Sequence, residues 1–467
     1  MTRRLAALVL CIAIATHASS AQPQSIGTAR DILRELIAIN TAEPDGNTTR
    51  AAELVRARLK AAGFTDGDVQ ILGPDDRHGS LVARLRGSGK GRPVLFLAHL
   101  DVVPAAREDW SVDPFVLTEK DGYYYGRGTT DDKQFAAIWA AAFISARRSG
   151  FVPDRDLILA LTAGEEGALG DLNGVNFLLS HHRELVDAEY VINGDAGGGS
   201  IKNGRNVAFG VQAAEKRYMD VTLEVTNPGG HSSLPVKDNA IYRLARALGR
   251  VDELSFPIRL NDVTRAYFDK RGAVEGGAVG DAMRALAAGK ADAAAFVRLT
   301  ADPIANSMMR TTCVATQLAA GHAPNALPQR AKANVNCRML PDEDAKALVA
   351  TVREAIADPA VAVSAVTESK PSPPTQALHP EAMTVISAAA EAVWPGVPVI
   401  PMMEPGGTDG VFFRSLGIPA FGVNHFGPDD DVRAHGGDER IGIREFEDAV
   451  RFGDAAIRIA GGGTPPR

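Results

Sequence analysis

The segment that decides the fold is PVLFLAHL, residues 93–100, a short apolar run whose penultimate residue is a histidine. A second run of the same kind, LILALTA, occupies residues 157–163. Neither run alternates between apolar and polar residues, which is typical of parallel strands that helices cover on both faces. Between the two runs, Lys133–Arg148 has the pattern of a crossover helix. This order predicts a three-layer α/β/α domain, in which functional residues gather at the carboxyl ends of the strands.

The pattern changes after about residue 213. Tyr218–Thr226 (YMDVTLEVT) and Ala331–Arg338 alternate between apolar and polar residues, so each predicts a strand with one exposed face. Helices are expected at Asn239–Val251 and Asp342–Ala357. An α+β module is therefore predicted at residues 214–370, inserted into an α/β domain that comprises residues 22–213 and 371–467.

The first 21 residues are expected to be a signal peptide. Arg3 and Arg4 precede the apolar run Leu5–Ala15, and small residues suited to a signal peptidase follow it. That run is too short to cross a hydrocarbon layer of about 30 Å as a permanent helix. We therefore expect an exported protein, periplasmic or secreted, without stable membrane insertion; a retained N-terminal anchor is the alternative.

Length and composition exclude several classes of protein. The chain has 467 residues, a net charge of −7, 45% hydrophobic residues and 23% charged residues. These values are ordinary for a globular protein and argue against disorder and against nucleic-acid binding. A single hydrophobic core stops growing at about 250–300 residues, so at least two domains are expected.

Two cysteines remain once Cys11 is assigned to the signal peptide. Cys337 alternates with Val335 and Met339, which favours a small buried apolar residue, and a Cys313–Cys337 disulfide is the alternative. Neither cysteine has the clustered spacing of a thiolate zinc site.

Metal-ligand residue types stand at the predicted strand ends. His99 and Asp101 close the first apolar run two residues apart, so both project from the same side. Without other evidence, such a pair more often consists of ordinary surface residues or of residues that cap a helix. The next run, however, ends in Glu165 and Glu166, and two adjacent buried carboxylates are costly unless cations compensate them.

Asp131, Asp132 and Asp195 extend this set. The first two lie in the turn GRGTTDDK before the crossover helix, where helix capping is the simpler interpretation, and Asp195 follows another short strand. Oxygen and imidazole ligands without a thiolate are compatible with two hydrolytic zinc ions.

Taken in order, the motifs HLDVVP, GRGTTDDK, GEEG, Gly-Asp and AHGGDER resemble those of the dinuclear-zinc metallopeptidases. That family includes aminoacylase, carnosinase, the glutamate-releasing carboxypeptidases and the ArgE/DapE-type deacylases, and the resemblance covers nearly all of the chain after the signal peptide. It implies that Asp131 bridges two zinc ions, for which cobalt or manganese could substitute. It further implies that His99 and Asp195 complete one metal site, and that Glu166 and His435 complete the other.

The resemblance also assigns roles beside the metals. Glu165 would be the general base, and Asp101 would orient His99. The peptide bond after Asp131 is often cis in this family. Asp132 receives no role, because the family varies at that position.

The inserted module resembles the family's ferredoxin-like lid, which commonly forms a homodimer interface. By this resemblance, His231 reaches the active site across the dimer and stabilises an oxyanion. Asn325 and Arg338 match positions that hold the substrate's carboxylate, a task that suits the planar guanidinium fork. Gly407 and Thr408 match a loop that contacts the substrate terminus, although a simple turn would also explain them.

Together with the predicted signal peptide, the resemblance implies an exported zinc-dependent metallopeptidase of the carboxypeptidase or dipeptidase type, which cleaves a peptide or amide bond next to a free carboxylate. A water held between the metals would attack, with Glu165 as general base. The first alternative is an N-acyl-amino-acid amidohydrolase, which differs only on the acyl side of the bond. A non-catalytic metal-dependent peptide-binding protein is the alternative from another class. The Ala-rich stretch Phe256–Ala301 would either shape the substrate pocket or pack the lid.

Overall fold

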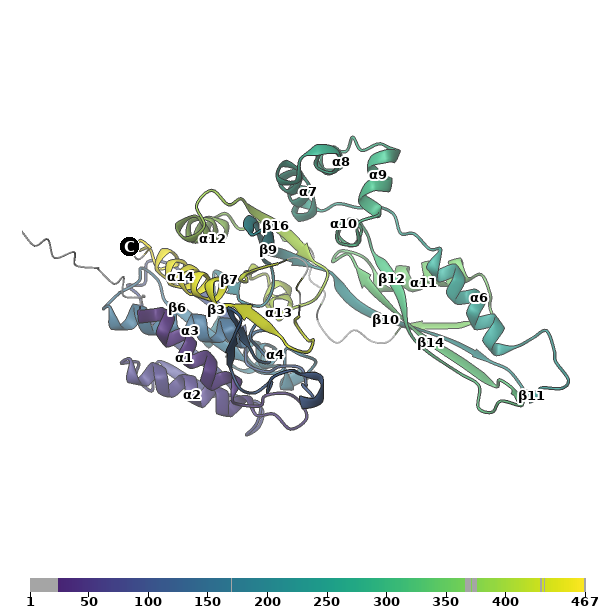
Figure 1. Cartoon of the computed structure of the whole chain (residues 1–467), viewed down its shortest axis with the longest axis horizontal. Coiled ribbons are helices and arrows are strands. Elements are labelled where there is room, and N and C mark those ends of the chain that lie inside the picture. Colours follow the sequence, from purple (N-terminus) through teal and green to yellow (C-terminus); the bar gives the residue numbers. More distant parts are fainter. Residues whose placement is uncertain are drawn as a thin grey trace, which may run out of the picture.

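The computed structural model describes residues 24–168, 170–365, 371, 376–428, 431 and 433–465, so the predicted signal peptide lies outside the described residues. Figure 1 shows a large domain, a separate lid and a group of helices beside the junction between them. Within the described ranges, no helix combines the length and the apolar character needed to span a membrane.

A ten-stranded mixed sheet forms the centre of the large domain. Nine of its strands follow one another in the order β1 (Val69–Leu72), β2 (Ser80–Leu85), β6 (Leu157–Thr162), β3 (Val94–His99), β7 (Tyr190–Asn193), β17 (Ala420–Gly422), β9 (Arg205–Glu215), β8 (Gly198–Lys202) and β18 (Phe426–Pro428). The tenth strand, β16 (Val399–Glu404), pairs with β9. β3 runs parallel to both β6 and β7, which brings the carboxyl ends of these three strands to one edge.

Helices cover both faces of this sheet, which confirms the three-layer prediction. On one face lie α1 (Gln24–Ile37), α2 (Thr48–Ala61), α3 (Lys133–Arg148), α12 (Pro380–Val393) and α14 (Ile443–Ala460). On the other lie α4 (Gly174–His181), α5 (Arg183–Val186) and α13 (Gly410–Ser415). Successive side chains of β3 enter different cores, because Phe96 packs with the first group and Leu97 with the second. Burial on both faces explains why the strand is apolar throughout.

A separate small sheet lies beside the large one and is formed by β4 (Thr118–Lys120), β5 (Tyr123–Tyr125) and β19 (Arg440–Gly442). It joins a segment that precedes α3 to one near the C-terminus, because β19 pairs with β5.

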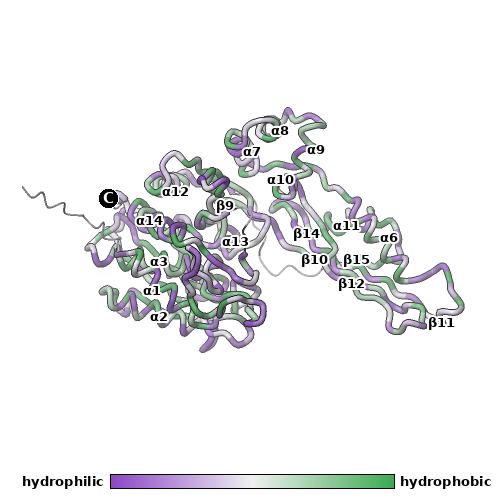
Figure 2. The backbone as a smooth tube through the Cα atoms, viewed as in Figure 1, coloured by the Kyte–Doolittle hydropathy of each residue, from purple (hydrophilic) through white to green (hydrophobic). Residues whose placement is uncertain are grey.

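The lid has the βαββαβ order of a ferredoxin-like fold. Its elements are β10 (Arg217–Thr226), α6 (Ala240–Asp252), β12 (Thr312–Ala320), β14 (Arg330–Met339), α11 (Ala345–Ile356) and β15 (Ala362–Ala365). The antiparallel sheet order is β12-β14-β10-β15, and α6 and α11 share a core with one of its faces. A short antiparallel pair, β11 (Gly230–His231) and β13 (Ala326–Leu327), forms the tip, beside a largely hydrophilic loop (Figure 2).

The Ala-rich stretch forms a helical insertion between α6 and β12. It comprises α7 (Asp262–Glu275), α8 (Gly277–Ala287), α9 (Ala293–Thr300) and α10 (Pro303–Met309). Its apolar residues belong to the core of the large domain rather than to that of the lid sheet. Asn261 donates to the sulfur of Met403 at 3.7 Å, and Lys270 donates to the carbonyl of Val399 at 3.5 Å. The insertion therefore packs on β16 of the large domain.

Cys313 and Cys337 form a disulfide, so the favoured prediction of an unpaired buried Cys337 was wrong. Cys337 is indeed buried in the lid core, but Cys313 lies directly opposite it in strand register, with the Cα atoms 4.1 Å apart. The sequence indicated this pairing only as the alternative, because the alternation that identifies β14 is missing from β12, an edge strand that is largely exposed.

Replacing Cys313 with serine should lower the free energy of unfolding by about 2–4 kcal/mol, because the disulfide restricts the unfolded chain. Chemical denaturation under non-reducing conditions measures this difference. Wild type and variant should become nearly equal once a reducing agent is present. Equal stability under both conditions would contradict the prediction.

Candidate metal centre

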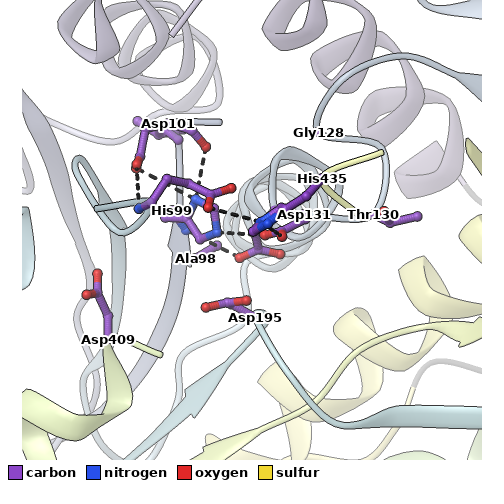
Figure 3. Close-up of polar contacts among 12 residues, drawn as sticks. Ala98, His99, Asp101, Gly128, Thr130, Asp131, Asp195, Asp409 and His435 are labelled. Atoms are coloured by element: carbon purple, nitrogen blue, oxygen red, sulfur yellow. Dashed lines mark hydrogen bonds and ion pairs between the residues drawn. The ribbon is translucent and has the colours of Figure 1, made fainter. Parts of the chain in front are cut away.

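Six predicted residues come together at one edge of the large sheet. His99 is the last residue of β3, Glu165 and Glu166 follow β6, and Asp195 follows β7. Asp131 lies in the turn before α3, and its peptide bond to Asp132 is cis, as the family resemblance implies. His435 lies in the loop before β19 (Arg440–Gly442). Figure 3 shows His99, Asp131, Asp195 and His435 around a common centre.

Two sets of potential ligand atoms share His99. The ligand atoms of His99, Asp131 and Glu166 all lie within 4.8 Å of one another, and so do those of His99, Glu165 and Asp195. Asp131 presents one oxygen to each histidine, at 2.9 Å from Nε2 of His99 and 3.0 Å from Nε2 of His435. Nε2 of His435 also lies 3.0 Å from Oε2 of Glu166. Asp131 therefore lies between two groups of ligands.

The carboxylates of this cluster need positive charge. Burial raises the pKa of Asp195 well above its ordinary value, with a further contribution from the charge of Glu165, and burial also raises the pKa of Glu166. Hydrogen bonds to Asp131 and Glu166 raise the pKa of His435 to about 10. Protonated imidazole thus compensates part of the negative charge in the protein alone. Divalent cations would take over that role and displace the protons.

An unpaired polar atom supports a metal site at the same place. Oε1 of Glu166 is buried and, among the described residues, has no hydrogen-bond partner. Leaving a buried carboxylate oxygen without a partner is costly. A cation bound by Glu166 would remove that cost. The nitrogen and oxygen donors of the cluster fit zinc, and they also suit cobalt or manganese.

Asp101 contacts two of the candidate metal ligands, His99 and Glu166. The nearest acceptor for Nδ1 of His99 is the backbone carbonyl of Asp101 at 3.0 Å, and the Asp101 carboxylate is 3.6 Å away. The other carboxylate oxygen accepts a hydrogen bond of 3.0 Å from the backbone N–H of Glu166. Both contacts would hold ligand side chains in orientation.

Glu439 is a supporting residue that the sequence analysis missed. It is fully buried, and its carboxylate accepts hydrogen bonds from the N–H groups of Gly128 and Thr130, at 3.1 and 2.7 Å, and from Arg127 at 2.6 Å. These contacts shape the turn that carries Asp131. Glu439 belongs to the motif AHGGDER, but the sequence does not reveal its partners.

Replacing Glu439 with glutamine should destabilise the protein by about 3–5 kcal/mol, because it leaves the buried Arg127 guanidinium without its counterion. Thermal and chemical denaturation of the metal-free protein test this expectation. The matched control is Glu119→Gln on the exposed surface of the neighbouring strand β4, which should change stability by less than about 0.5 kcal/mol. Similar effects of the two substitutions would contradict the role of Glu439.

The predicted substrate-binding residues fall into two groups. At the junction of lid and large domain, Nη1 of Arg338 lies 3.4 Å from the carbonyl of Pro405, just before the loop that carries Gly407. Gly407 is exposed, and there is open space where its side chain would be. Thr408 is buried, and its N–H and hydroxyl donate to Glu215 at 3.0 and 3.1 Å. Its hydroxyl therefore forms a hydrogen bond in the interior of the large domain.

His231 and Asn325 form the second group, at the tip of the lid. Both are exposed, and the carbonyl of Asn325 accepts a hydrogen bond from Ser232 at 3.1 Å. The paired strands β11 and β13 lie at the end of the lid remote from the large domain (Figure 1). A single chain therefore does not bring these two residues to the metal centre.

Comparisons with known proteins agree with this geometry. Residues 95–458 match the family model described as peptidase family M20/M25/M40. The chain is 29% identical over 374 residues to human N-fatty-acyl-amino acid synthase/hydrolase PM20D1, covering 77% of this chain and 72% of that protein. It is 28% identical over 393 residues to probable carboxypeptidase S-like 2 of Dictyostelium discoideum, covering 80% of this chain and 73% of that protein.

A solved structure shares the fold. The M20 family metallo-carboxypeptidase Sso-CP2 from Sulfolobus solfataricus superposes with a TM-score of 0.70 at 19% identity, covering 93% of this chain and 99% of that chain. Together with the match to the family model, this confirms the family that the sequence motifs predicted. The chain belongs to peptidase family M20/M25/M40 and is a hydrolase of peptide or amide bonds.

Proposed function

We propose that this hydrolase cleaves the amide bond of an N-acyl amino acid next to the free carboxylate, with two zinc ions held by His99, Asp131, Glu166, Asp195 and His435. The observation that carries the proposal is the position of Asp131, which has one oxygen 2.9 Å from Nε2 of His99 and the other 3.0 Å from Nε2 of His435. Bound zinc ions would supply a Lewis acid for the scissile carbonyl and lower the pKa of water.

Glu165 is the proposed proton carrier. Its carboxylate lies at the end of β6, with an oxygen within 4.8 Å of the ligand atoms of His99 and Asp195. From there it would accept the proton of the attacking water and then deliver it to the leaving amine. An intact carboxylate at this position also argues against the non-catalytic binding protein, which would need the ligands but no base.

Arg338 is proposed to bind the substrate's carboxylate. It reaches from the lid to the loop that follows Pro405, so its guanidinium lies where the lid meets the large domain. A guanidinium pairs with a carboxylate through two parallel hydrogen bonds and thereby fixes the orientation of the bond to be cleaved.

The acyl side of the bond separates the two candidate substrates. Similarity to N-fatty-acyl-amino acid synthase/hydrolase PM20D1 supports N-acyl amino acids. Similarity to a probable carboxypeptidase S-like protein supports peptides as the second candidate, with the chain acting as a carboxypeptidase or dipeptidase.

A substrate panel tests the proposal. The purified protein, loaded with zinc, is offered N-acyl amino acids and dipeptides, with and without a chelator. We expect chelator-sensitive release of the free amino acid, faster from N-acyl amino acids than from dipeptides. The reverse order would favour the peptidase. A zinc-loaded protein that binds these compounds and cleaves none would favour the binding protein.

We further propose a homodimer formed through the lid. The exposed His231 and Asn325 lie far from the metal centre of their own chain, so a second copy would have to carry them to the site. His231 would then stabilise the oxyanion in the partner's site.

Mixing two inactive variants tests this arrangement. In a mixed dimer of His231→Ala and Glu165→Gln chains, one site combines an intact Glu165 with an intact His231 from the other chain. Activity should therefore return after dissociation and reassociation, to about half of the wild-type rate per mixed dimer. An equal mixture that stays inactive although mixed dimers form would overturn the shared site.

Export to the periplasm or the exterior is also part of the proposal. The Cys313–Cys337 disulfide supports it, because disulfides persist mainly in oxidising compartments. Sequencing the N-terminus of the protein recovered from the periplasm or the medium tests whether cleavage occurs after residue 21.

A further inference from the structure

The open face of the lid sheet carries a polar network next to Arg338. We propose that Tyr218 and Asp220 are positioning residues that hold the Arg338 guanidinium ready for the substrate's carboxylate. This inference rests on the proposed function of Arg338 and adds two residues to which neither the sequence motifs nor the comparisons assign a role.

Tyr218 is the direct partner of Arg338. The two residues lie opposite each other in the register of β10 and β14, on the face that the lid helices leave uncovered. The guanidinium carbon of Arg338 lies 4.7 Å from the ring centroid of Tyr218. A guanidinium over an aromatic face is attracted by the ring, and the ring also restricts its orientation.

Asp220 fixes the tyrosine. The hydroxyl of Tyr218 donates to one Asp220 oxygen at 2.8 Å, and the other oxygen accepts hydrogen bonds of 2.9 Å from the amides of Asn334 and Asn336. Although burial opposes them, these hydrogen bonds keep the pKa of Asp220 below its ordinary value. Asp220 is thus a charged acceptor with fixed partners, and it holds the ring through the phenol hydroxyl.

Arg338 itself retains unused hydrogen-bonding capacity. In the part of the chain that the structure describes, its polar partner is the carbonyl of Pro405, and no carboxylate forms an ion pair with it. Most of its five N–H donors therefore have no acceptor among the residues that the structure describes. Since Tyr218 is 51% exposed, the ring and the guanidinium together offer a surface that a carboxylate can approach.

The experiment compares KM for an N-acyl amino acid with that for its C-terminal amide, measured as a substrate or as a competitive inhibitor. Tyr218→Leu should raise KM for the carboxylate compound about 3- to 30-fold, the range of a cation–π contact, with little change in kcat. Binding of the amide should change by less than about twofold, since Tyr218 acts through the Arg338–carboxylate pair. Tyr218→Phe keeps the ring and should have a smaller effect than Tyr218→Leu. The control Glu119→Gln, on the exposed surface of β4 in the large domain, should behave as wild type.

A double-mutant cycle separates positioning from a general structural effect. In an Arg338→Ala background, Tyr218→Leu should cause no further rise in KM. Additive effects of the two substitutions, or a Tyr218→Leu variant with wild-type KM, would overturn the inference while the role of Arg338 stands. If Arg338→Ala itself leaves the preference for the carboxylate unchanged, the carboxylate subsite of the proposed function fails.

Discussion

Replacing Glu165 with glutamine should reduce kcat by at least a factor of about 10²–10⁴ and leave the zinc content of the protein unchanged. Glutamine has nearly the same shape as glutamate and keeps an oxygen near His99 and Asp195, but it cannot accept and return a proton. Single-turnover rates with an N-acyl amino acid, together with the number of zinc ions per chain, measure both halves of the expectation.

Two results would contradict this assignment. Retention of most of the activity by purified Glu165→Gln would show that another group carries the proton. Loss of zinc from the variant would show that Glu165 acts as a ligand rather than as the base. The control Glu119→Gln, on the exposed surface of β4, should change neither quantity.

Replacing the adjacent Glu166 with alanine should also abolish activity, but unlike Glu165→Gln it should reduce the amount of bound zinc. Glu166 places one oxygen 3.0 Å from His435, and its other oxygen is buried with no hydrogen-bond partner in the described part of the chain. Removing this carboxylate takes a ligand and a negative charge from one of the two proposed metal sites. Metal analysis after dialysis should find about one zinc ion fewer per chain than in wild type.

Thermal unfolding gives an independent readout of the same variant. Zinc that binds only the folded protein stabilises it by RT ln(1 + [Zn]/Kd), about 2.7 kcal/mol when zinc exceeds its Kd a hundredfold. Wild type and Glu165→Gln should therefore show the same rise in Tm on adding zinc, and Glu166→Ala a smaller one. An undiminished rise in Glu166→Ala would remove Glu166 from the ligand set.

The fold class and the position of the candidate metal-ligand cluster could be predicted from the sequence because both depend on local patterns. The continuous apolar run of β3 indicated burial on both faces, and its alternate residues do enter the two helix-covered cores. Acids and a histidine at successive strand ends indicated a common site, because parallel strands bring their carboxyl ends to one edge. These features are properties of short segments and of the topology that they impose.

Contacts between distant segments could not be predicted in the same way. The Cys313–Cys337 disulfide depends on the register of β12, whose exposed edge position leaves no alternation in the sequence. The sequence of the helical insertion is rich in apolar residues, but its pattern does not indicate which domain these residues pack against. Only the structure places the insertion on β16. Glu439 meets the turn before α3 across more than 300 residues of chain.

The sequence by itself determined the layers of the large domain, the alternating strands of the lid and the residues that gather at the strand ends, since hydrophobic periodicity and chain order are sufficient for these. Tertiary structure alone decided several contacts at that site and beyond it. The Asp101 carboxylate accepts a hydrogen bond from the N–H of Glu166, the Glu439 carboxylate accepts from the turn before α3, and in the lid the guanidinium of Arg338 lies over the ring of Tyr218. The physical reason is that such contacts act over a few ångströms between residues far apart in the chain. Only the packed fold brings these partners together.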